Sequence, residues 1–180
     1  MEQIYVVGVG MTPFGKLADV SIKAMTKQAV DAALADAGIG ADALQAAYFG
    51  NASQGHMEGQ QMIRGQVALR SMGIGGIPVV NVENACASGS SALNLAVNFV
   101  RSGEGDVALA VGAEKMFSRD RDLMFSVFDS AWDVSQADAI RDRLLQLGEG
   151  VEVPPGTVST KPYSVFMDVY AAFARFHMKR

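Results

Sequence analysis

The sequence predicts an α/β fold, with a layered domain of alternating strands and helices followed by a partly helical cap segment. β-rich apolar runs alternate with segments of helical periodicity through residues 1–115. The last of these runs, residues 107–112, is apolar throughout, as expected of a strand covered by helices on both faces. From residue 116 the chain changes to charge pairs and Pro/Gly breaks. We therefore predict a layered domain over residues 1–115 and a cap over residues 116–180.

The first strand and helix are predicted close to the N-terminus. Residues 4–10 form a short β-rich run that ends in a Gly/Thr/Pro turn. Ser21 is a residue type that caps helix N-termini, and Gly38 is one that ends helices. The expected apolar face of this helix consists of Ile22, Met25, Ala29 and Ala33.

The same alternation predicts two further units. Residues 46–50 are the second strand, and a glycine-rich loop leads from it to a helical segment. That segment is expected to contain Met62, Ile63 and Val67. Residues 79–82 are the third strand, and they run into a helix expected from about Cys86 to Arg101.

The cap is expected to contain a short helix near residues 135–147 and a last helix with one aromatic face. That face consists of Phe166, Tyr170, Phe173 and His177. A single histidine on an apolar face is more often a core residue than a catalyst, so we interpret His177 as part of the core.

Composition and charge narrow the classes of function. The 180 residues are 49% hydrophobic and 19% charged, with a net charge of -4 and no Lys/Arg-rich run, so no nucleic acid partner is expected. The sequence contains neither a signal peptide pattern nor a run long enough to span a membrane. One cysteine builds no internal disulfide and no thiolate metal site, which favours a reducing cytoplasm and no bound metal.

That single cysteine, Cys86, is the candidate catalytic residue. Asn84 is expected to cap the helix and to place Cys86 in its first turn, where the helix dipole favours a thiolate. The dipole contributes about 1 kcal/mol and at best ~2, so a nucleophile also needs a histidine or another cation nearby. Small residues follow, and apolar residues from Leu93 onward are expected to bury the helix between two layers.

The alternative for Cys86 is a small buried hydrophobic residue, which is the more common role of a lone cysteine. Its position after an apolar strand and before a Ser/Gly run favours the nucleophile. No Gly-x-Ser-x-Gly is present, so a serine hydrolase is disfavoured. Residues 8–15 lack the glycine spacing of a dinucleotide-binding loop.

At these residues the sequence resembles the thiolase superfamily, and within it the sterol-carrier-protein type thiolases and the acetyl-CoA acetyltransferases. Residues 83–90, Glu-Asn-Ala-Cys-Ala-Ser-Gly-Ser, resemble the nucleophile signature of that family. The other similar segments are residues 12–15, 59–66, 112–116 and 162–166.

The resemblance implies the first of two βαβαβαββ halves with a loop domain over the active site. It implies an acyl-CoA acyltransferase in which Cys86 accepts the acyl group during 3-ketoacyl-CoA thiolysis, as in fatty acid β-oxidation, or acetoacetyl-CoA synthesis. The backbone N–H of Cys86 is the expected oxyanion donor. Coenzyme A and acyl-CoA are expected as substrates, with no tightly bound cofactor.

In the family, the activating histidine, a second cysteine and further oxyanion residues belong to a C-terminal half. This half is expected to be missing here, so that the chain alone is inactive. Residues 55–65 resemble the part of thiolases that packs across a dimer axis, which implies a homo-oligomer, either a dimer or a tetramer.

Two other functions remain open. One is a non-catalytic thiolase-like module that binds acyl-CoA or scaffolds a complex. The other is a retro-aldolase on the same fold that acts on a sterol side-chain thioester with an OB-fold partner protein and does not need the thiol. The intact cysteine motif favours acyl transfer over both.

Overall fold

The computed structural model describes residues 3–161 and 163–179. The chain divides into two compact units, Met1–Phe117 and Ser118–Arg180. Pro162, the first residue of the predicted motif at 162–166, lies outside the described residues.

The first unit is built on a sheet of three parallel strands. They are β1 (Ala46–Gly50), β2 (Val79–Val82) and β3 (Ala108–Gly112), in the order β2-β1-β3. Ala47 of β1 pairs with Val79 on one side and with Leu109 on the other. The predicted α/β class is thus confirmed, since parallel neighbours require a crossover helix between them.

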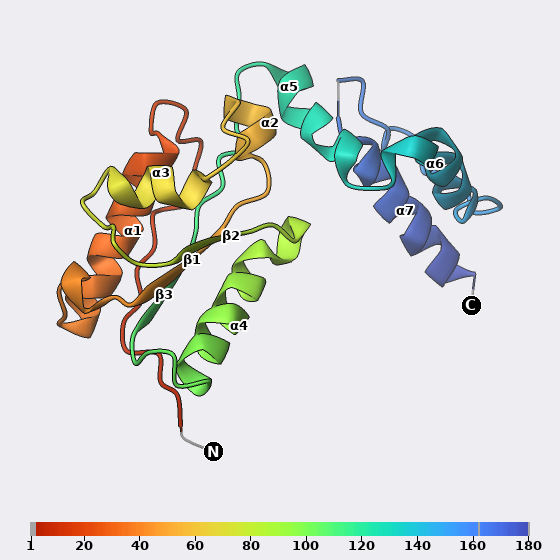
Figure 1. Cartoon of the computed structure of the whole chain (residues 1–180). Coiled ribbons are helices and arrows are strands. Elements are labelled where there is room, and N and C mark those ends of the chain that lie inside the picture. The colour runs from red at the N-terminus through yellow and green to blue at the C-terminus, as the bar shows by residue number, and fades with distance from the viewer. Residues whose placement is uncertain (1–2, 162, 180) are drawn as a thin grey trace. The chain divides into compact units, whose positions relative to one another are not determined.

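Helices cover both faces of this sheet. In Figure 1, α4 (Ser88–Arg101) lies on one face, and α1 (Ile22–Ala37) and α3 (Arg64–Arg70) lie on the other. Two short helices, η1 (Ala41–Ala43) and α2 (Gln54–Glu58), lie in the connections. The core between the sheet and the α1–α3 layer includes Ile22, Met25, Val30, Leu44, Ala47, Phe49, Ala68, Leu69, Ile74, Leu109, Val111 and Ala113.

Helix α1 begins and ends where the sequence predicts. The Ser21 hydroxyl accepts a hydrogen bond from the Ala24 N–H at 3.1 Å, and Gly38 closes the helix at φ +69°. This φ favours glycine because it has no Cβ to clash with the backbone. Ile22 and Met25 are buried, as expected.

The predicted first strand is wrong. Residues 4–10 are extended but belong to no sheet of the described chain. They lie against α1 instead, because Gly10 and Gly8 allow contact with its backbone: a Cβ on Gly10 would come within 2.1 Å of the Ala29 oxygen. The Val9 N–H donates to Asp36 Oδ2 at 2.9 Å. A segment of β-rich composition therefore packs on the surface of α1 and does not pair with a strand of the sheet.

The start of the second predicted helix is also wrong. Met62 and Ile63 were expected inside it, but α3 begins only at Arg64 and both side chains are exposed. Ile63 has φ +49°, a left-handed conformation that interrupts helical geometry before α3.

The second unit is helical, as predicted for the cap. It contains α5 (Arg121–Ser126), α6 (Ala137–Gln146) and α7 (Val165–Met178), with single turns η3 (Val127–Ser130) and η4 (Val134–Gln136). Helices α6 and α7 pack together. Trp132 stacks on Phe166 of α7 with ring centroids 4.8 Å apart.

The aromatic face predicted for α7 is not a core face. The helix buries Val169 and Ala172, while Tyr170 is 62% exposed and His177 is exposed. The interpretation of His177 as a core residue is therefore wrong. Helical spacing predicted one aromatic face, but the face of α7 that is buried in the second unit is the one with Val169 and Ala172.

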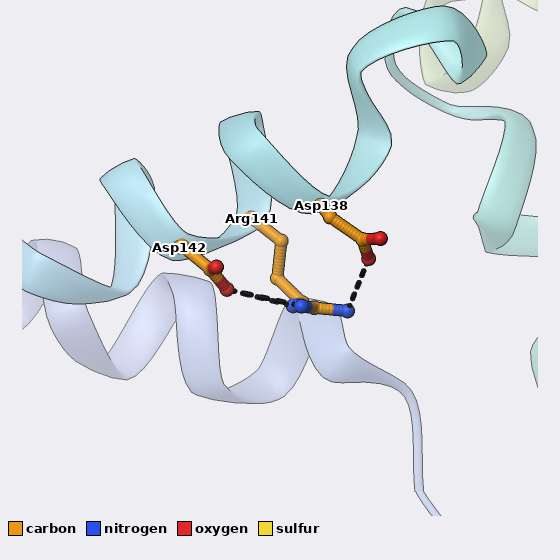
Figure 2. Close-up of polar contacts among 3 residues, drawn as sticks. All are labelled: Asp138, Arg141 and Asp142. Carbon is orange, nitrogen blue, oxygen red and sulfur yellow. Dashed lines mark hydrogen bonds and ion pairs between the residues drawn. The ribbon is translucent and has the colours of Figure 1, made fainter.

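Helix α6 carries an ion-pair network, shown in Figure 2. The Arg141 guanidinium contacts Asp138 at 2.8 Å and Asp142 at 3.0 Å. The hydrogen bond from Arg141 to Asp142, with the charge of that carboxylate, raises the pKa of Arg141. The network is exposed to solvent, so its contribution to stability is small.

Candidate active site around Cys86

Cys86 lies in the connection between β2 and α4, in the single 3₁₀ turn η2 (Ala85–Ala87). Its side chain is exposed. The turn follows the carboxyl end of a parallel strand, the edge at which α/β sheets hold their ligands. In the described chain, Cys86 is therefore not packed as a small buried hydrophobic residue.

The residue before the cysteine has an unusual backbone. Ala85 has φ +45°, a conformation that costs a non-glycine residue on the order of 1–3 kcal/mol. Its N–H donates to Glu83 Oε1 at 2.6 Å, and its carbonyl oxygen accepts from the Ser88 hydroxyl at 2.8 Å. Hydrogen bonds on both sides therefore hold Ala85 in this conformation.

The predicted capping role of Asn84 is wrong. Its side chain makes no cap hydrogen bond, and Asn84 Nδ2 donates to the Ser91 hydroxyl at 3.0 Å instead. The left-handed Ala85 prevents a regular helix from starting at Asn84, so α4 begins at Ser88. Cys86 accordingly precedes the first turn of α4, at the same positive end of the helix.

Small residues let α4 approach the sheet closely at this end. Ser88 is buried, and a Cβ on Gly50 of β1 would lie 2.9 Å from the backbone carbonyl oxygen of Ser88. Farther along, Ala92 and Ala96 face the sheet, whereas Leu93 is 48% exposed. The predicted burial of Leu93 between two layers is therefore wrong for the described chain, where α4 has a sheet on one side only.

A polar cluster organises the loops at the same end of the sheet. The Glu114 carboxylate, after β3, accepts hydrogen bonds from the Ala52 N–H at 2.8 Å and the Ser53 N–H at 2.9 Å. The buried Asn51, after β1, donates to the Ala113 oxygen at 2.6 Å. Arg64 Nη1 donates to the Asn51 oxygen and to Asn51 Oδ1, at 2.8 and 2.9 Å.

Sequence reasoning did not identify Asn51 and Ser53. The available signal was their position directly after a strand, where polar side chains meet at one sheet edge. Glu114 and Arg64 lie within segments that carried the family resemblance, but no role was assigned to them.

Beside this cluster lies a pocket of about 230 Å³. Its lining combines apolar side chains with one cation, one carboxylate and three amides: Phe49, Asn51, Gln61, Met62, Ile63, Arg64, Asn81, Val82 and Glu83. It reaches the segment that leads into Cys86.

Among residues 3–161 and 163–179, Cys86 is a free cysteine. Within these ranges no side chain hydrogen-bonds to its sulfur, and no three His, Cys, Asp or Glu residues cluster as a metal site would require. His56 belongs to α2 in the first unit, and His177 to α7 in the second. None of the helices described has the length and apolar character needed to cross a membrane.

Comparison with known proteins agrees with this geometry. The profile of the family "Thiolase, N-terminal domain" matches residues 4–148. Non-specific lipid-transfer protein-like 2 of Caenorhabditis elegans is 33% identical over 99% of this chain and 40% of its own length. Acetyl-CoA acetyltransferase of Methanothermobacter thermautotrophicus is 41% identical over 64% of this chain and 30% of its own length. Sterol carrier protein 2 of Gallus gallus is 40% identical over 64% of this chain and 20% of its own length.

Among solved structures, 3-oxoacyl-(acyl carrier protein) synthase III from Xanthomonas oryzae is similar with a TM-score of 0.51 and 22% identity. The match covers 72% of this chain and 37% of that one, and it concerns the fold alone. This chain spans 20% to 40% of the length of the three curated relatives named above. The family match covers most of the chain and includes Cys86 with its turn. The chain therefore belongs to the thiolase family, in which it corresponds to the N-terminal domain.

Proposed function

We propose that this chain is the nucleophile-bearing part of a thiolase-type acyl-CoA acyltransferase, and that Cys86 accepts the acyl group. The observation that supports this most strongly is the exposed Cys86 after the carboxyl end of β2, within the segment that the thiolase N-terminal domain family matches. An exposed thiol at the start of a helix is favourably placed for nucleophilic attack.

The proposed reaction has two halves. In the first half of acetoacetyl-CoA synthesis, the Cys86 thiolate attacks the thioester carbonyl of acetyl-CoA, a carbon–sulfur bond forms, and coenzyme A leaves as a thiolate that takes up a proton. In the first half of thiolysis, the thiolate attacks the 3-keto carbonyl of 3-ketoacyl-CoA instead, the C2–C3 bond breaks, and acetyl-CoA leaves as an enolate that takes up a proton. In the second half, an acetyl-CoA enolate (synthesis) or a coenzyme A thiolate (thiolysis) attacks the acyl-cysteine and releases the Cys86 thiolate. The Cys86 N–H would stabilise the oxyanion in both halves.

A thiol at a helix end needs a base as well, because the dipole contributes only about 1 kcal/mol. We propose that the histidine comes from polypeptide beyond these 180 residues, as the resemblance to thiolases implies. Coenzyme A enters as part of a substrate and not as a bound cofactor. A reducing compartment such as the cytoplasm belongs to the same proposal, since a lone exposed thiol is oxidised elsewhere.

Acylation of Cys86 is the direct test. After brief exposure to acetyl-CoA, the chain mixed with the C-terminal half of a thiolase relative is expected to gain one acetyl group, which peptide mass mapping places on Cys86. Cys86→Ala is the matched control and should gain none. A wild-type chain that stays unmodified while the complemented sample is folded would contradict the proposal.

The same experiment separates the two alternatives. A scaffold or acyl-CoA-binding module predicts that Cys86→Ser retains ligand binding and that the wild-type chain is not acylated. A retro-aldolase working with an OB-fold partner predicts that Cys86→Ala retains cleavage of the sterol thioester.

We further propose that the chain self-associates through the edge formed by β2 and the loop before α3. β2 is an outer strand of the sheet, with Val80 43% exposed, and next to it Met62 and Ile63 are 76% and 57% exposed. An open strand edge with apolar neighbours favours pairing with another chain.

Sedimentation tests this proposal. The wild-type chain is expected to sediment as a dimer or tetramer, and Val80→Lys is expected to shift it toward the monomer, because a lysine on an edge strand opposes pairing. Val134→Lys, at an exposed valine of the second unit, is the matched control and should sediment as the wild type does. A wild-type chain that remains monomeric at every concentration would contradict the proposal.

A further inference from the structure

The Ser88 hydroxyl makes two hydrogen bonds to the turn that carries Cys86. It accepts from the Asn84 N–H at 2.8 Å and donates to the Ala85 oxygen at 2.8 Å. Ser88 is only 5% exposed, so solvent does not replace these bonds readily. One side chain thus contacts the backbone on both sides of the strained residue.

The two bonds matter because of the conformation between them. Left-handed backbone at a non-glycine residue persists only where its surroundings hold it. The Ser88 backbone is itself fixed, since its oxygen packs against Gly50 of the central strand. The position of Ala85, and of Cys86 directly after it, is therefore tied to the sheet through Ser88.

The other serines of this segment differ. Ser90 donates to the Ala87 oxygen at 3.0 Å, and Ser91 accepts from the Asn84 side chain. Neither bonds to the backbone of Asn84 or Ala85, and Ser90 is exposed. Ser88 is thus distinguished from two chemically identical neighbours.

We propose that Ser88 is a positioning residue, whose hydroxyl holds Ala85 in its left-handed conformation and so keeps the Cys86 sulfur at the positive end of α4. This inference rests on the proposed function in taking Cys86 as the nucleophile. Without the hydroxyl, Ala85 relaxes to an ordinary conformation and Cys86 loses its fixed place before α4.

Alkylation of Cys86 by iodoacetamide at one fixed neutral pH, followed by mass spectrometry, tests the proposal on the chain as it is. In Ser88→Ala the rate is expected to fall about five- to tenfold, because the sulfur loses its fixed place at the helix end. Ser90→Ala is the matched control, with the wild-type rate. An unchanged rate in Ser88→Ala would overturn the proposal.

A second variant separates positioning from general loss of structure. Glycine adopts positive φ without steric cost, so Ala85→Gly removes the need for the hydroxyl to hold the turn. The double variant Ala85→Gly with Ser88→Ala is expected to regain an alkylation rate within about twofold of the wild type. A double variant that is alkylated as slowly as Ser88→Ala would overturn the proposal. The control double variant, Ala85→Gly with Ser90→Ala, is expected to react at the wild-type rate, and a faster rate there would also overturn the proposal.

Failure of the proposed function remains distinguishable from failure of this inference. A wild-type chain that is never acylated, but whose alkylation depends on Ser88 as described, contradicts the acyltransferase and supports the positioning role. A wild-type chain that is acylated, but whose alkylation does not depend on Ser88, supports the acyltransferase and contradicts the positioning role.

Discussion

Phe49→Ala is expected to lower the free energy of unfolding of the first unit by about 3–5 kcal/mol. Phe49 is fully buried in the central strand β1 and is the largest fully buried side chain in the described core. Helix α3 closes over it, since a Cβ on Gly65 would lie 2.6 Å from the Phe49 Cβ. The close approach of α3 at Gly65 limits collapse of the cavity, so the loss should be near the upper end. Urea denaturation followed by circular dichroism measures it.

Phe14→Ala is the matched control for this prediction. The Phe14 side chain is 92% exposed, so its removal is expected to change the unfolding free energy by less than about 0.5 kcal/mol. If the two variants lost equal stability, the packing of β1 against α3 would not be the centre of the core.

Gly50→Ala is expected to destabilise the first unit by about 1–3 kcal/mol and to alter the reactivity of Cys86 at the same time. The added Cβ would lie 2.9 Å from the Ser88 oxygen and 3.0 Å from the Ser88 carbonyl carbon. These are backbone atoms, which cannot turn away as a side chain does, so the start of α4 must shift. Denaturation curves and the rate of Cys86 alkylation report the two effects separately.

Gly112→Ala provides a control at the same end of the neighbouring strand. A Cβ there would lie 3.6 Å from the backbone oxygen of Gly50, which is an ordinary contact distance. We expect near wild-type stability and alkylation. If Gly50→Ala and Gly112→Ala behaved alike, the close approach of Ser88 to β1 would have no part in placing Cys86.

The sequence allowed much of the fold to be predicted, because local signals were strong at most elements. Ser21 and Gly38 bound α1 as expected, and the apolar runs at residues 46–50 and 79–82 are strands. Residues 4–10 carry an equally strong β signal, yet they lie on α1. Strand propensity describes one segment, whereas pairing requires a second segment that the sequence does not specify.

The position of Cys86 near the start of a helix was predicted, but the backbone geometry of its turn was not. The motif around Cys86 indicated a nucleophile at the start of a helix, and the helix does begin there. Asn84 was expected to cap it from sequence position, but Ala85 at φ +45° turns the chain and gives the Asn84 side chain another partner. A left-handed alanine has no sequence signature, because alanine rarely adopts that conformation.

By itself the sequence determined the α/β class, both ends of α1 and the family, because these depend on local patterns and a contiguous motif. Only the three-dimensional structure decided that the Ser88 hydroxyl bonds to the Cys86 turn, and that Glu114, Asn51 and Arg64 meet at the same edge of the sheet. The contacts among Glu114, Asn51 and Arg64 join segments far apart in the sequence. They exist because the parallel sheet brings the ends of β1, β2 and β3 to one edge.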